Sequence, residues 1–381
     1  MPLTRRRDVR PASEGRCETA APHMIGQSLM DPLPHPSRPR RPVPGLVSLL
    51  GAAILAVALA GCGGGSAHTV TTTTSRTVTS TSTSTAAQTT TTTTTAASLP
   101  GTGRPTITIG DKNYAEQFVL GQLYLKALQA QGFKVNITEN IGPTSVVLGS
   151  LKDHTLAMYP EYINVVLETL AHDRRSFKTL ADAVTSGQLW AARHGLELLA
   201  PTPFSDTTGV AVTDAYAAEN HLHTLADLLN VATTLTIGGA VQFKTNRSGL
   251  HALLEGYGVK PAMFTPLAVG DEYTSLDANT VQAAFINTTD GELATGDYRV
   301  LQDPQNVFGY GNVVPVVTQQ ALAQEGPAFA ATIERVDRTL TLNTMRQLNN
   351  AVSVANLPPA TVATQYLQTH GLLGPLTPSD Y

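Results

Sequence analysis

The sequence predicts an α/β fold built in two lobes, and three observations lead to this class. Short β-branched runs alternate with segments of helical periodicity from Thr106 onward. The alternation starts again near residue 209, and the C-terminus from Gln319 to Leu373 has the pattern of helices alone. Strands separated by helices favour parallel sheets, and open α/β sheets bind ligands at the carboxyl ends of their strands. Two such units in series therefore allow a ligand cleft between two lobes.

The first unit is expected to contain strands and helices in strict alternation. β-branched or alternating residues predict strands at 106–109, 133–137 and 156–158. Apolar residues at helical spacing predict helices at 115–131, 143–151 and 161–171. Gly110 follows the first strand as its exit turn, and Gly132 ends the first helix.

The second unit repeats this pattern with shorter elements. Strands are expected at 210–212, 235–238, 281–286, 299–301 and 313–317, and helices at 222–229 and 248–257. The loops that follow strands are the candidates for ligand contact. They comprise residues 110–117, 142–145, 159–162, 238–249, 287–291 and 308–312.

The N-terminal region has the layout of a secretory signal. Three arginines at positions 38, 40 and 41 precede an uncharged apolar stretch at 45–61, and Leu59-Ala60-Gly61 stands directly before Cys62. This run resembles the lipobox of bacterial lipoproteins, in which the signal is cut before the cysteine and the thiol is acylated. A spanning helix needs roughly 20 apolar residues, and this run is slightly short. Residues 1–61 are therefore expected to be a signal peptide, with Met24 and Met30 as alternative start residues.

Charge and cysteine content narrow the possible partners. Residues 1–61 hold eight of the 25 basic and four of the 29 acidic residues, so the remainder carries 17 and 25, a net charge of −8. This acidic balance without basic runs makes nucleic acid a poor partner. No polybasic patch assists membrane binding, so the acyl chains would provide the anchor. With Cys62 acylated, no disulfide is expected in the mature chain.

Residues 62–104 are expected to form a tether between lipid and folded domain. Gly63-Gly64-Gly65-Ser66 leads into a tract at 69–95 made almost wholly of Thr, Ser, Val and Ala. The tract has no apolar stripe to bury, so it cannot offset the entropy of ordering its backbone. Its composition is that of a flexible linker and also fits an O-glycosylated stalk. The folded domain is expected at 105–381.

Five motifs of the folded region follow one another along the chain. They are Gly110-Asp111-Lys112-Asn113-Tyr114-Ala115-Glu116-Gln117, Tyr159-Pro160-Glu161-Tyr162, Thr288-Thr289-Asp290-Gly291, Tyr310-Gly311-Asn312-Val313-Val314-Pro315-Val316-Val317 and Thr344-Met345-Arg346-Gln347-Leu348-Asn349. This set resembles the motifs of substrate-binding proteins from glycine betaine, choline and carnitine ABC transporters, which are Gly-Ser-Lys-Asn-Phe-Thr-Glu-Gln, Tyr-Pro-Glu-Tyr, Thr-Thr-Asp-Gly, Pro-Tyr-Asn-x-x-Pro-Val-Val and Thr-Met-Arg-x-Leu-Asn. No single tetrapeptide is specific, but the ordered set covers the whole folded region.

The resemblance implies a type II periplasmic-binding-protein fold, in which two lobes joined by two crossover segments close on a ligand. Lobe one would comprise residues 106–208 and 314–381, and lobe two residues 209–313. The protein would capture a quaternary ammonium osmoprotectant, such as glycine betaine or choline, and deliver it to an ABC permease with its ATPase subunit. It would work outside the cytoplasm, tethered to the cell membrane by its lipid.

A quaternary ammonium has no hydrogen to donate, so proteins surround it with aromatic faces. The resemblance implies a tyrosine cage, with Tyr159 and Tyr310 as walls and Tyr162 either lining the site or packing beneath it. Lys112 and Arg247 are candidates to bind a betaine carboxylate, and a planar guanidinium suits that task best. Arg247 is displaced by one residue from the family's position, which could place Asn246 in the cleft instead.

Polar contacts and departures from the family complete the expected site. Gln117 and Asn113 lie at a helix start, where free backbone N–H groups favour an anion, and Thr144 is either a ligand contact or a helix cap. Thr208 and Asn287 stand where the family often has cage tyrosines. Either Tyr114 or Tyr273 compensates from a neighbouring loop, or the ligand is more polar. The residues expected to bind the ligand are thus Lys112, Asn113, Tyr114, Gln117, Thr144, Tyr159, Tyr162, Asn246, Arg247, Asn287 and Tyr310.

Other functions have weaker support in the sequence. His221 and His223 could bind a metal, but no third ligand accompanies them, and no metal or cofactor is expected. The sequence contains neither a G-x-S-x-G elbow nor a P-loop, so enzyme activity is not expected. A ligand sensor without a transport partner remains the alternative to a transporter component.

Overall fold

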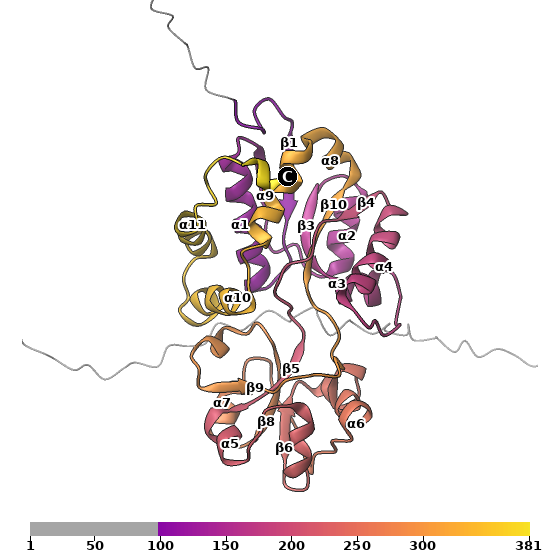
Figure 1. Ribbon diagram of the computed structural model, residues 1–381, viewed down its shortest axis with the longest axis vertical. Helices are drawn as coiled ribbons and strands as arrows, with labels where there is room; N and C mark the ends of the chain where they lie inside the picture. Colours follow the sequence, from indigo (N-terminus) through magenta and orange to yellow (C-terminus); the bar gives the residue numbers. More distant parts are fainter. Residues whose placement is uncertain (1–97) are drawn as a thin grey trace, which may run out of the picture. The chain divides into compact units, whose positions relative to one another are not determined.

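The computed structural model describes residues 98–381, and two five-stranded mixed sheets organise them (Figure 1). Each sheet forms the centre of one lobe of an α/β fold. The predicted signal peptide, the cysteine at position 62 and the Thr-rich tract at 69–95 lie outside the described residues. The last residues of the predicted tether belong to the folded part, since the Gly101 N–H donates to the Gln131 carbonyl at 2.9 Å and Arg104 donates to the Gln324 carbonyl at 2.9 Å.

The first sheet has the strand order β2-β1-β3-β10-β4. Its strands are β1 (Thr106–Gly110), β2 (Lys134–Thr138), β3 (Met158–Tyr162), β4 (Leu196–Leu198) and β10 (Val313–Thr318). β1 runs parallel to β2 and β3, whereas β10 is antiparallel to β3 and β4. The parallel pairing that the alternation favours thus holds for β1, β2 and β3 but not for β10. β10 returns from the other lobe and begins beside the end of β3, with Val313 opposite Tyr162, so it must run in the reverse direction.

The second sheet repeats this mixture with the order β7-β6-β8-β5-β9. Its strands are β5 (Thr208–Thr213), β6 (Thr236–Gly239), β7 (Met263–Pro266), β8 (Ala283–Asn287) and β9 (Tyr298–Val300). β6 is parallel to β7 and β8, whereas β5 is antiparallel to β8 and β9. β5 enters this sheet from the first lobe, as β10 enters the first sheet from the second.

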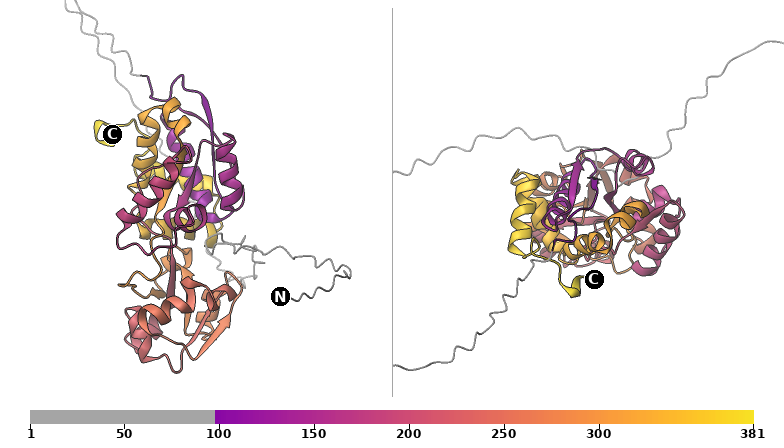
Figure 2. Two further views of the ribbon diagram at one scale, coloured as in Figure 1. Left: turned by 90° about the vertical axis from the view of Figure 1, so that its right-hand side faces the viewer. Right: turned by 90° about the horizontal axis from the view of Figure 1, so that it is seen from above.

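Helices cover both faces of the first sheet (Figure 1; Figure 2). One face carries α1 (Ala115–Ala130), α9 (Pro327–Asp337), α10 (Leu342–Asn349) and α11 (Pro359–Thr369); the other carries α2 (Thr144–Lys152), α3 (Ile163–Val165) and α4 (Leu180–Ala192). α8 (Gln319–Glu325) follows β10. Alternate residues of β10 point to opposite faces of the sheet. Val313 and Val317 therefore belong to the core on the side of α1, and Val314 and Val316 belong to the core on the side of α4. Both faces of this sheet are therefore buried.

The second lobe uses shorter elements around two smaller cores. Its helices are α5 (Asp214–Glu219), α6 (Ala252–Tyr257) and α7 (Glu272–Asp277), with 3₁₀ turns at Leu225–Asn230, Val241–Lys244 and Gly291–Ala294. One core joins the sheet to α5 and α6, and the other joins it to α7. The helix expected at 222–229 is a 3₁₀ turn, and the one expected at 248–257 begins as a π-helical turn at Arg247–His251.

β3 is the largest correction to the expected elements. The sequence predicts a strand at 156–158 and a helix from 161, but the strand runs from Met158 to Tyr162 and the helix begins at Ile163. Pro160 lies opposite Pro315 of β10 in the ladder. Because proline has no N–H to donate to a strand ladder, a proline in the sequence argues against a strand. Here the two prolines lie opposite each other in the ladder. The Tyr-Pro-Glu-Tyr motif is therefore strand rather than loop.

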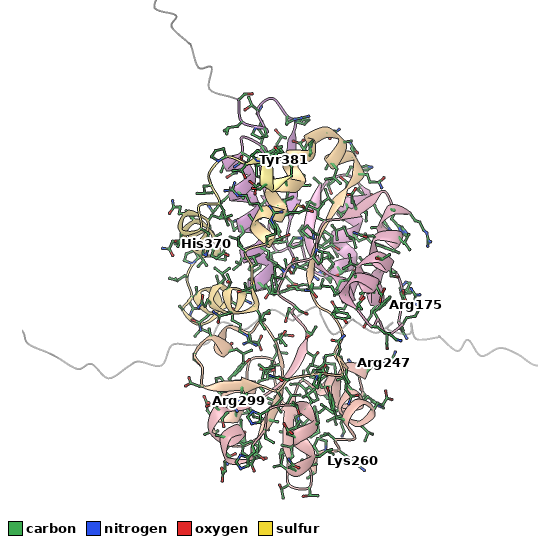
Figure 3. All side chains as sticks on the ribbon, viewed as in Figure 1. Arg175, Arg247, Lys260, Arg299, His370 and Tyr381 are labelled. Atoms are coloured by element: carbon green, nitrogen blue, oxygen red, sulfur yellow. The ribbon has the colours of Figure 1, made fainter. Side chains whose placement is uncertain are left out.

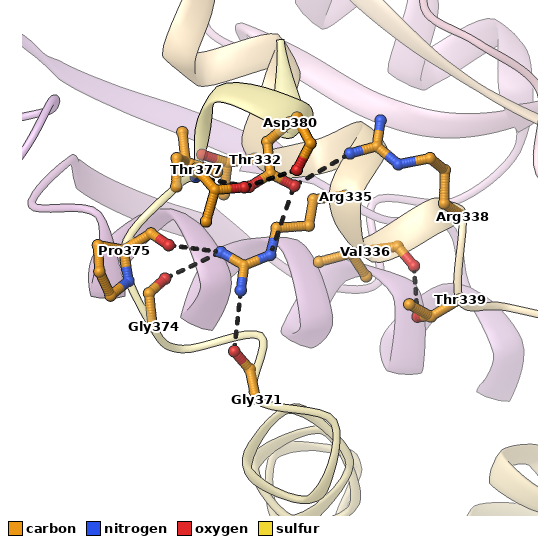
Figure 4. Close-up of polar contacts among 12 residues, drawn as sticks. Thr332, Arg335, Val336, Arg338, Thr339, Gly371, Gly374, Pro375, Thr377 and Asp380 are labelled. Atoms are coloured by element: carbon orange, nitrogen blue, oxygen red, sulfur yellow. Dashed lines mark hydrogen bonds and ion pairs between the residues drawn. The ribbon is translucent and has the colours of Figure 1, made fainter.

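An arginine of α9 holds the C-terminal segment in place (Figure 4). The Arg335 guanidinium donates to the carbonyls of Gly371, Gly374 and Pro375 at 2.9–3.2 Å. Gln131, just after α1, also donates to the Gly374 carbonyl, at 2.7 Å. The end of the chain is thus fixed to the first lobe by polar contacts to its backbone.

The two connections between the lobes lie side by side. Ser205 and Asn312 form a bridge, and the Asp206 N–H donates to the Gly311 carbonyl at 2.9 Å. The Gly311 N–H in turn donates to the Ser205 hydroxyl at 2.9 Å. A Cβ on Gly311 would overlap the carbonyl oxygen of Asp206. The crossing therefore requires a residue without a side chain at 311.

Gly311→Ala is expected to lower the free energy of unfolding by about 1–3 kcal/mol, because overpacking of a close contact forces the backbone apart. Gly149→Ala is the matched control, since this position lies within α2 and a Cβ there would meet nothing within 4 Å. The control should gain about 0.5–1 kcal/mol from helix propensity. Urea denaturation measures both, and equal stability of the two variants would contradict the close approach.

Candidate ligand-binding site

A buried ion pair stands where β1 and β3 end. Lys112 follows β1 by two residues, and its Nζ donates to Glu161 Oε1 of β3 at 2.8 Å. Both side chains are 0% exposed. Lys112 also donates to the Thr144 hydroxyl at 3.2 Å. The structure thus joins two of the sequence motifs, 49 residues apart, through opposite charges.

The remaining hydrogen-bonding capacity of Glu161 is also used. Its Oε2 accepts from the hydroxyls of Thr144 at 3.0 Å and Tyr159 at 3.1 Å. Its Oε1 further accepts from the backbone N–H of Tyr162 at 2.9 Å. A buried ion pair is tolerated only with good geometry and additional hydrogen bonds, and this pair has both.

Two tyrosine rings lie against the lysine ammonium. The rings of Tyr114 and Tyr162 stack with centroids 6.3 Å apart and planes at 23°. Lys112 Nζ lies 5.7 Å from the first centroid and 5.4 Å from the second. These distances are in the range of cation–π attraction. Both rings are buried, so the Lys112 ammonium already uses aromatic faces of the kind that would attract a ligand cation.

Tyr159 and Tyr310 belong to the opposite face of the first sheet. Tyr159 is fully buried in the core beside α2, α3 and α4, and Tyr310 packs against the same core from its edge. The Tyr310 hydroxyl donates to the carbonyl of Lys178 at 2.8 Å. The expected tyrosines therefore form two pairs, one on each face of the sheet.

A carboxyl group of α1 connects this region to the second lobe. Glu116 accepts from the Tyr162 hydroxyl and from Asn349 Nδ2, both at 2.7 Å. The same Asn349 amide donates to the carbonyl of Thr289, in the loop after β8, at 2.9 Å. Glu116 and Asn349 are both almost fully buried. A single amide therefore bridges a buried acid in one lobe and the backbone of the other.

Two neighbours of Asn349 add further contacts between the lobes. Arg346 Nε donates to the Thr288 carbonyl at 2.8 Å, and Asn350 Nδ2 donates to the Gly291 carbonyl at 2.9 Å. The Thr-Met-Arg-x-Leu-Asn motif thus meets the Thr-Thr-Asp-Gly motif, and the acceptors are all main-chain oxygens.

Burial shifts the ionisation of the acids in this region. Desolvation raises the pKa of Glu116, against the opposing hydrogen bonds from Thr289, Tyr162 and Asn349. Desolvation also raises the pKa of Asp206 well above its usual range, and the charge of Glu116 adds to this. Burial raises the pKa of Asp290 to about 8, assisted by the charge of Glu292. Each of these carboxyl groups is therefore harder to ionise in the folded protein than in water.

The helix-start residues lie beside the ion pair. Gln117 is fully buried, and its Oε1 accepts from the backbone N–H of Lys112 at 3.3 Å. Asn113 is half-buried just before α1. Thr144 is buried and bound to both charged groups of the pair, while Pro143 takes the N-cap position of α2. Thr144 is thus part of the polar network and not the cap of its helix.

The second-lobe candidates lie apart from this cluster. Arg247 is exposed, and its guanidinium donates to the Arg174 carbonyl of the first lobe at 3.4 Å; Figure 3 shows it on the same side of the molecule as Arg175. Asn246 is half-buried at the start of the same turn. The structure therefore does not bring Arg247 to Lys112.

Thr208 and Asn287, which replace family tyrosines, are direct partners in the ladder between β5 and β8. Both substitutions thus fall at one place in the second sheet. Tyr273 does not take over their role, because it is buried and its hydroxyl donates to Asp290 Oδ2 at 3.0 Å. Tyr114 does lie within the cluster around Lys112.

Several polar residues described above were not among the expected ligand-binding residues, namely Glu116, Glu161, Asp206, Asp290, Arg346, Asn349 and Asn350. Glu161 and Asn349 occupy fixed places in two of the family motifs, and that was the available signal. Asp206 lies in the first connection between the lobes. The sequence drew attention to this segment only through Thr208, which stands where the family often has a tyrosine.

Two other features are absent from residues 98–381. No helix in this range is long and apolar enough to cross a membrane. The same residues contain no group of three His, Cys, Asp or Glu side chains that could hold a metal ion.

Two α/β lobes joined by paired connections, with tyrosines and buried charges at the strand ends, define a type II periplasmic binding protein. The chain belongs to the family of substrate-binding domains of ABC-type glycine betaine transport systems, which its residues 105–369 match. It is therefore a binding component of an ABC transporter and not an enzyme.

Individual relatives agree with this family. The chain is 29% identical over 288 residues to the glycine betaine-binding protein YehZ of Escherichia coli (strain K12). This match covers 72% of this chain and 94% of YehZ. It is 26% identical to the carnitine transport binding protein OpuCC of Listeria monocytogenes, over 72% of this chain and 90% of that one. The structure of apo YehZ has a TM-score of 0.62 at 28% identity and covers 70% of this chain and 99% of its own.

The raised pKa of Asp290 predicts a stability that falls with pH. A carboxyl group with a raised pKa in the folded state contributes its full stabilisation at pH values below its ordinary pKa of 3.8. That contribution to the free energy of unfolding is lost as the pH rises to about 8, the pKa of Asp290 in the folded protein. Within that window the loss from one such group is about 1.4 kcal/mol per pH unit. Asp290→Asn should therefore reduce the decline of the unfolding free energy between pH 5 and 8.

Asp277→Asn is the matched control for this experiment. Asp277 also accepts a tyrosine hydroxyl, from Tyr298 at 2.7 Å, but this pair is at the surface. Urea denaturation at several pH values compares the three proteins. If the unfolding free energy of Asp290→Asn falls with pH as steeply as that of the control, the raised pKa of Asp290 is contradicted.

Proposed function

We propose that the protein is the solute-binding lipoprotein of an ABC importer, and that it captures a quaternary ammonium osmoprotectant and delivers it to a permease. The observation that carries this proposal is the cluster of Tyr114, Tyr159 and Tyr162 around buried charges at the ends of β1 and β3. Aromatic faces attract a cation that cannot donate hydrogen bonds, by about 0.5–2 kcal/mol per contact.

The comparisons support the same class of solute. The family is described as the substrate-binding domain of glycine betaine transport systems. The similar proteins are named for glycine betaine and for carnitine. Glycine betaine, choline and carnitine share a trimethylammonium group, which is the part that aromatic rings recognise. The tyrosine walls in this proposal are Tyr159 and Tyr310 on one face of the first sheet, with Tyr114 and Tyr162 on the other face.

Binding is proposed to occur between lobe one, residues 106–208 and 314–381, and lobe two, residues 209–313. The paired connections near Thr208 and Val313 would act as the hinge, since closure by hinge rotation is common in such folds. The ligand can drive closure only by binding the closed state better than the open one. Asn113, Gln117 and Asn246 would supply polar contacts.

A more polar solute is the alternative within the same fold. It is favoured by Thr208 and Asn287, which hydrogen-bond but present no aromatic face and lie opposite each other in the second sheet. The same module could also act as a ligand sensor, which a permease and ATPase encoded beside this chain would argue against.

Titration calorimetry with glycine betaine, choline, carnitine, proline betaine and ectoine tests the proposal. Micromolar binding of a quaternary amine is expected. Tyr310→Ala should weaken it by about 1–2 kcal/mol, because one aromatic wall is lost, whereas Tyr310→Phe should retain most of the affinity. Tyr216→Ala in α5 is the control and should change nothing. Binding of only polar, uncharged solutes would contradict the proposal.

The lipid anchor is tested separately. Cys62→Ala removes the thiol that would be acylated, so the protein should move from the membrane fraction to the soluble fraction of fractionated cells. An unchanged membrane fraction would instead indicate that the apolar stretch at 45–61 is itself the anchor.

A further inference from the structure

The loop after β8, residues 288–291, belongs to the second lobe but is bonded to the first. Three side chains within residues 346–350 donate to its carbonyl oxygens at 2.8–2.9 Å. On its other side, the Thr288 N–H donates to the carbonyl of Thr207, in the first connection, at 2.9 Å. The loop therefore extends the row of contacts that begins at the paired connections, although the chain does not cross between the lobes here.

Gly291 brings the two lobes into direct backbone contact. A Cβ added to it would lie 2.6 Å from the Asn350 nitrogen and 2.9 Å from the Asn349 carbonyl carbon. Gly291 is buried and does not have a positive φ. The glycine is thus required for the close approach and not for an unusual backbone conformation. Separating the lobes at this place would break hydrogen bonds among buried and half-buried groups, which is costly.

The lobes meet differently on the other side of the paired connections. There Arg247 donates to the Arg174 carbonyl at 3.4 Å, and both residues are exposed. In the shared view of Figures 1 and 3, α10 lies on the left and Arg247 on the right. This distance is long for a hydrogen bond, and water can replace an exposed partner at little cost. The contact of Arg247 is therefore much easier to break than the contact of Gly291.

We propose that the 288–291 loop and residues 346–350 form a third, non-covalent hinge. This contact persists when the lobes separate, so the lobes part on the side of Arg247. The difference in cost between the two contacts decides which of them opens. The inference rests on the proposed function, because it concerns the movement by which the lobes would close on a solute.

Spin labels on two pairs of introduced cysteines measure the movement on each side. The hinge pair is Gln347→Cys with Asp297→Cys, and the outer pair is Ser176→Cys with Thr245→Cys; all four positions are exposed. The two native cysteines are replaced by serine in both proteins. Double electron–electron resonance without ligand should give the outer pair a distance distribution roughly two-fold wider or more, because hinge motion is amplified away from its axis.

Substitutions test the hinge contact itself. Gly291→Ala places a Cβ against the Asn350 backbone, so the mean distance of the hinge pair should increase. Asn350→Ala is the second variant, in case the first fails to fold. It removes the bond to the Gly291 carbonyl and should widen the distribution of the hinge pair. Asn343→Ala, the same change at an exposed position of α10, is the matched control and should alter neither pair.

The outcomes separate this inference from the proposed function. A hinge pair whose distances without ligand spread as widely as those of the outer pair overturns the inference. A folded Asn350→Ala variant with an unchanged hinge pair overturns the role of Asn350. Glycine betaine, choline and carnitine are then added in turn. If none of them shifts the outer pair, the closure that the proposed function requires is contradicted, while the widths without ligand still decide on the hinge.

Discussion

The ion pair between Lys112 and Glu161 is the interaction on which the arrangement of the candidate site depends. Two opposite charges that are fully buried must remain together, because either one alone would carry a large desolvation cost. The pair therefore fixes the segment after β1 against β3. Around it, Thr144 and Tyr159 bind the carboxylate, and the rings of Tyr114 and Tyr162 lie against the ammonium. Each expected tyrosine of the first lobe thus contacts one of these two charges.

The same region also connects the lobes. From the pair, Tyr162 extends to Glu116, and Asn349 continues from Glu116 to the backbone of Thr289. A change at the tyrosines can therefore reach the second lobe through a short chain of buried hydrogen bonds. The network is not fully satisfied, because the buried amide oxygen of Asn349 has no hydrogen-bond partner. This path offers a physical route between ligand binding and the relative position of the lobes.

Local patterns in the sequence were sufficient for the fold class and for most elements. The mixed sheets could not be predicted this way, because the direction of β10 is decided by its return from another lobe and not by its own residues. Pro160 concealed the true extent of β3, since a proline paired with another proline is compatible with a strand only in that context. The structure brings two of the first-lobe motifs together, but the contact of Lys112 with Glu161 joins residues 49 positions apart. A single sequence does not contain that pairing.

The contacts of Arg346, Asn349 and Asn350 have a consequence for how this site can diversify. Their acceptors are the carbonyl oxygens of Thr288, Thr289 and Gly291, which every amino acid possesses. These three contacts therefore do not depend on which side chains the loop carries, except that a Cβ at Gly291 would meet Asn350. The Thr288 hydroxyl is different, because it accepts from the Thr207 N–H and donates to the Ser205 carbonyl. A substitution at Thr288 would thus keep the bond to Arg346 and lose the bonds of this hydroxyl to the first connection between the lobes.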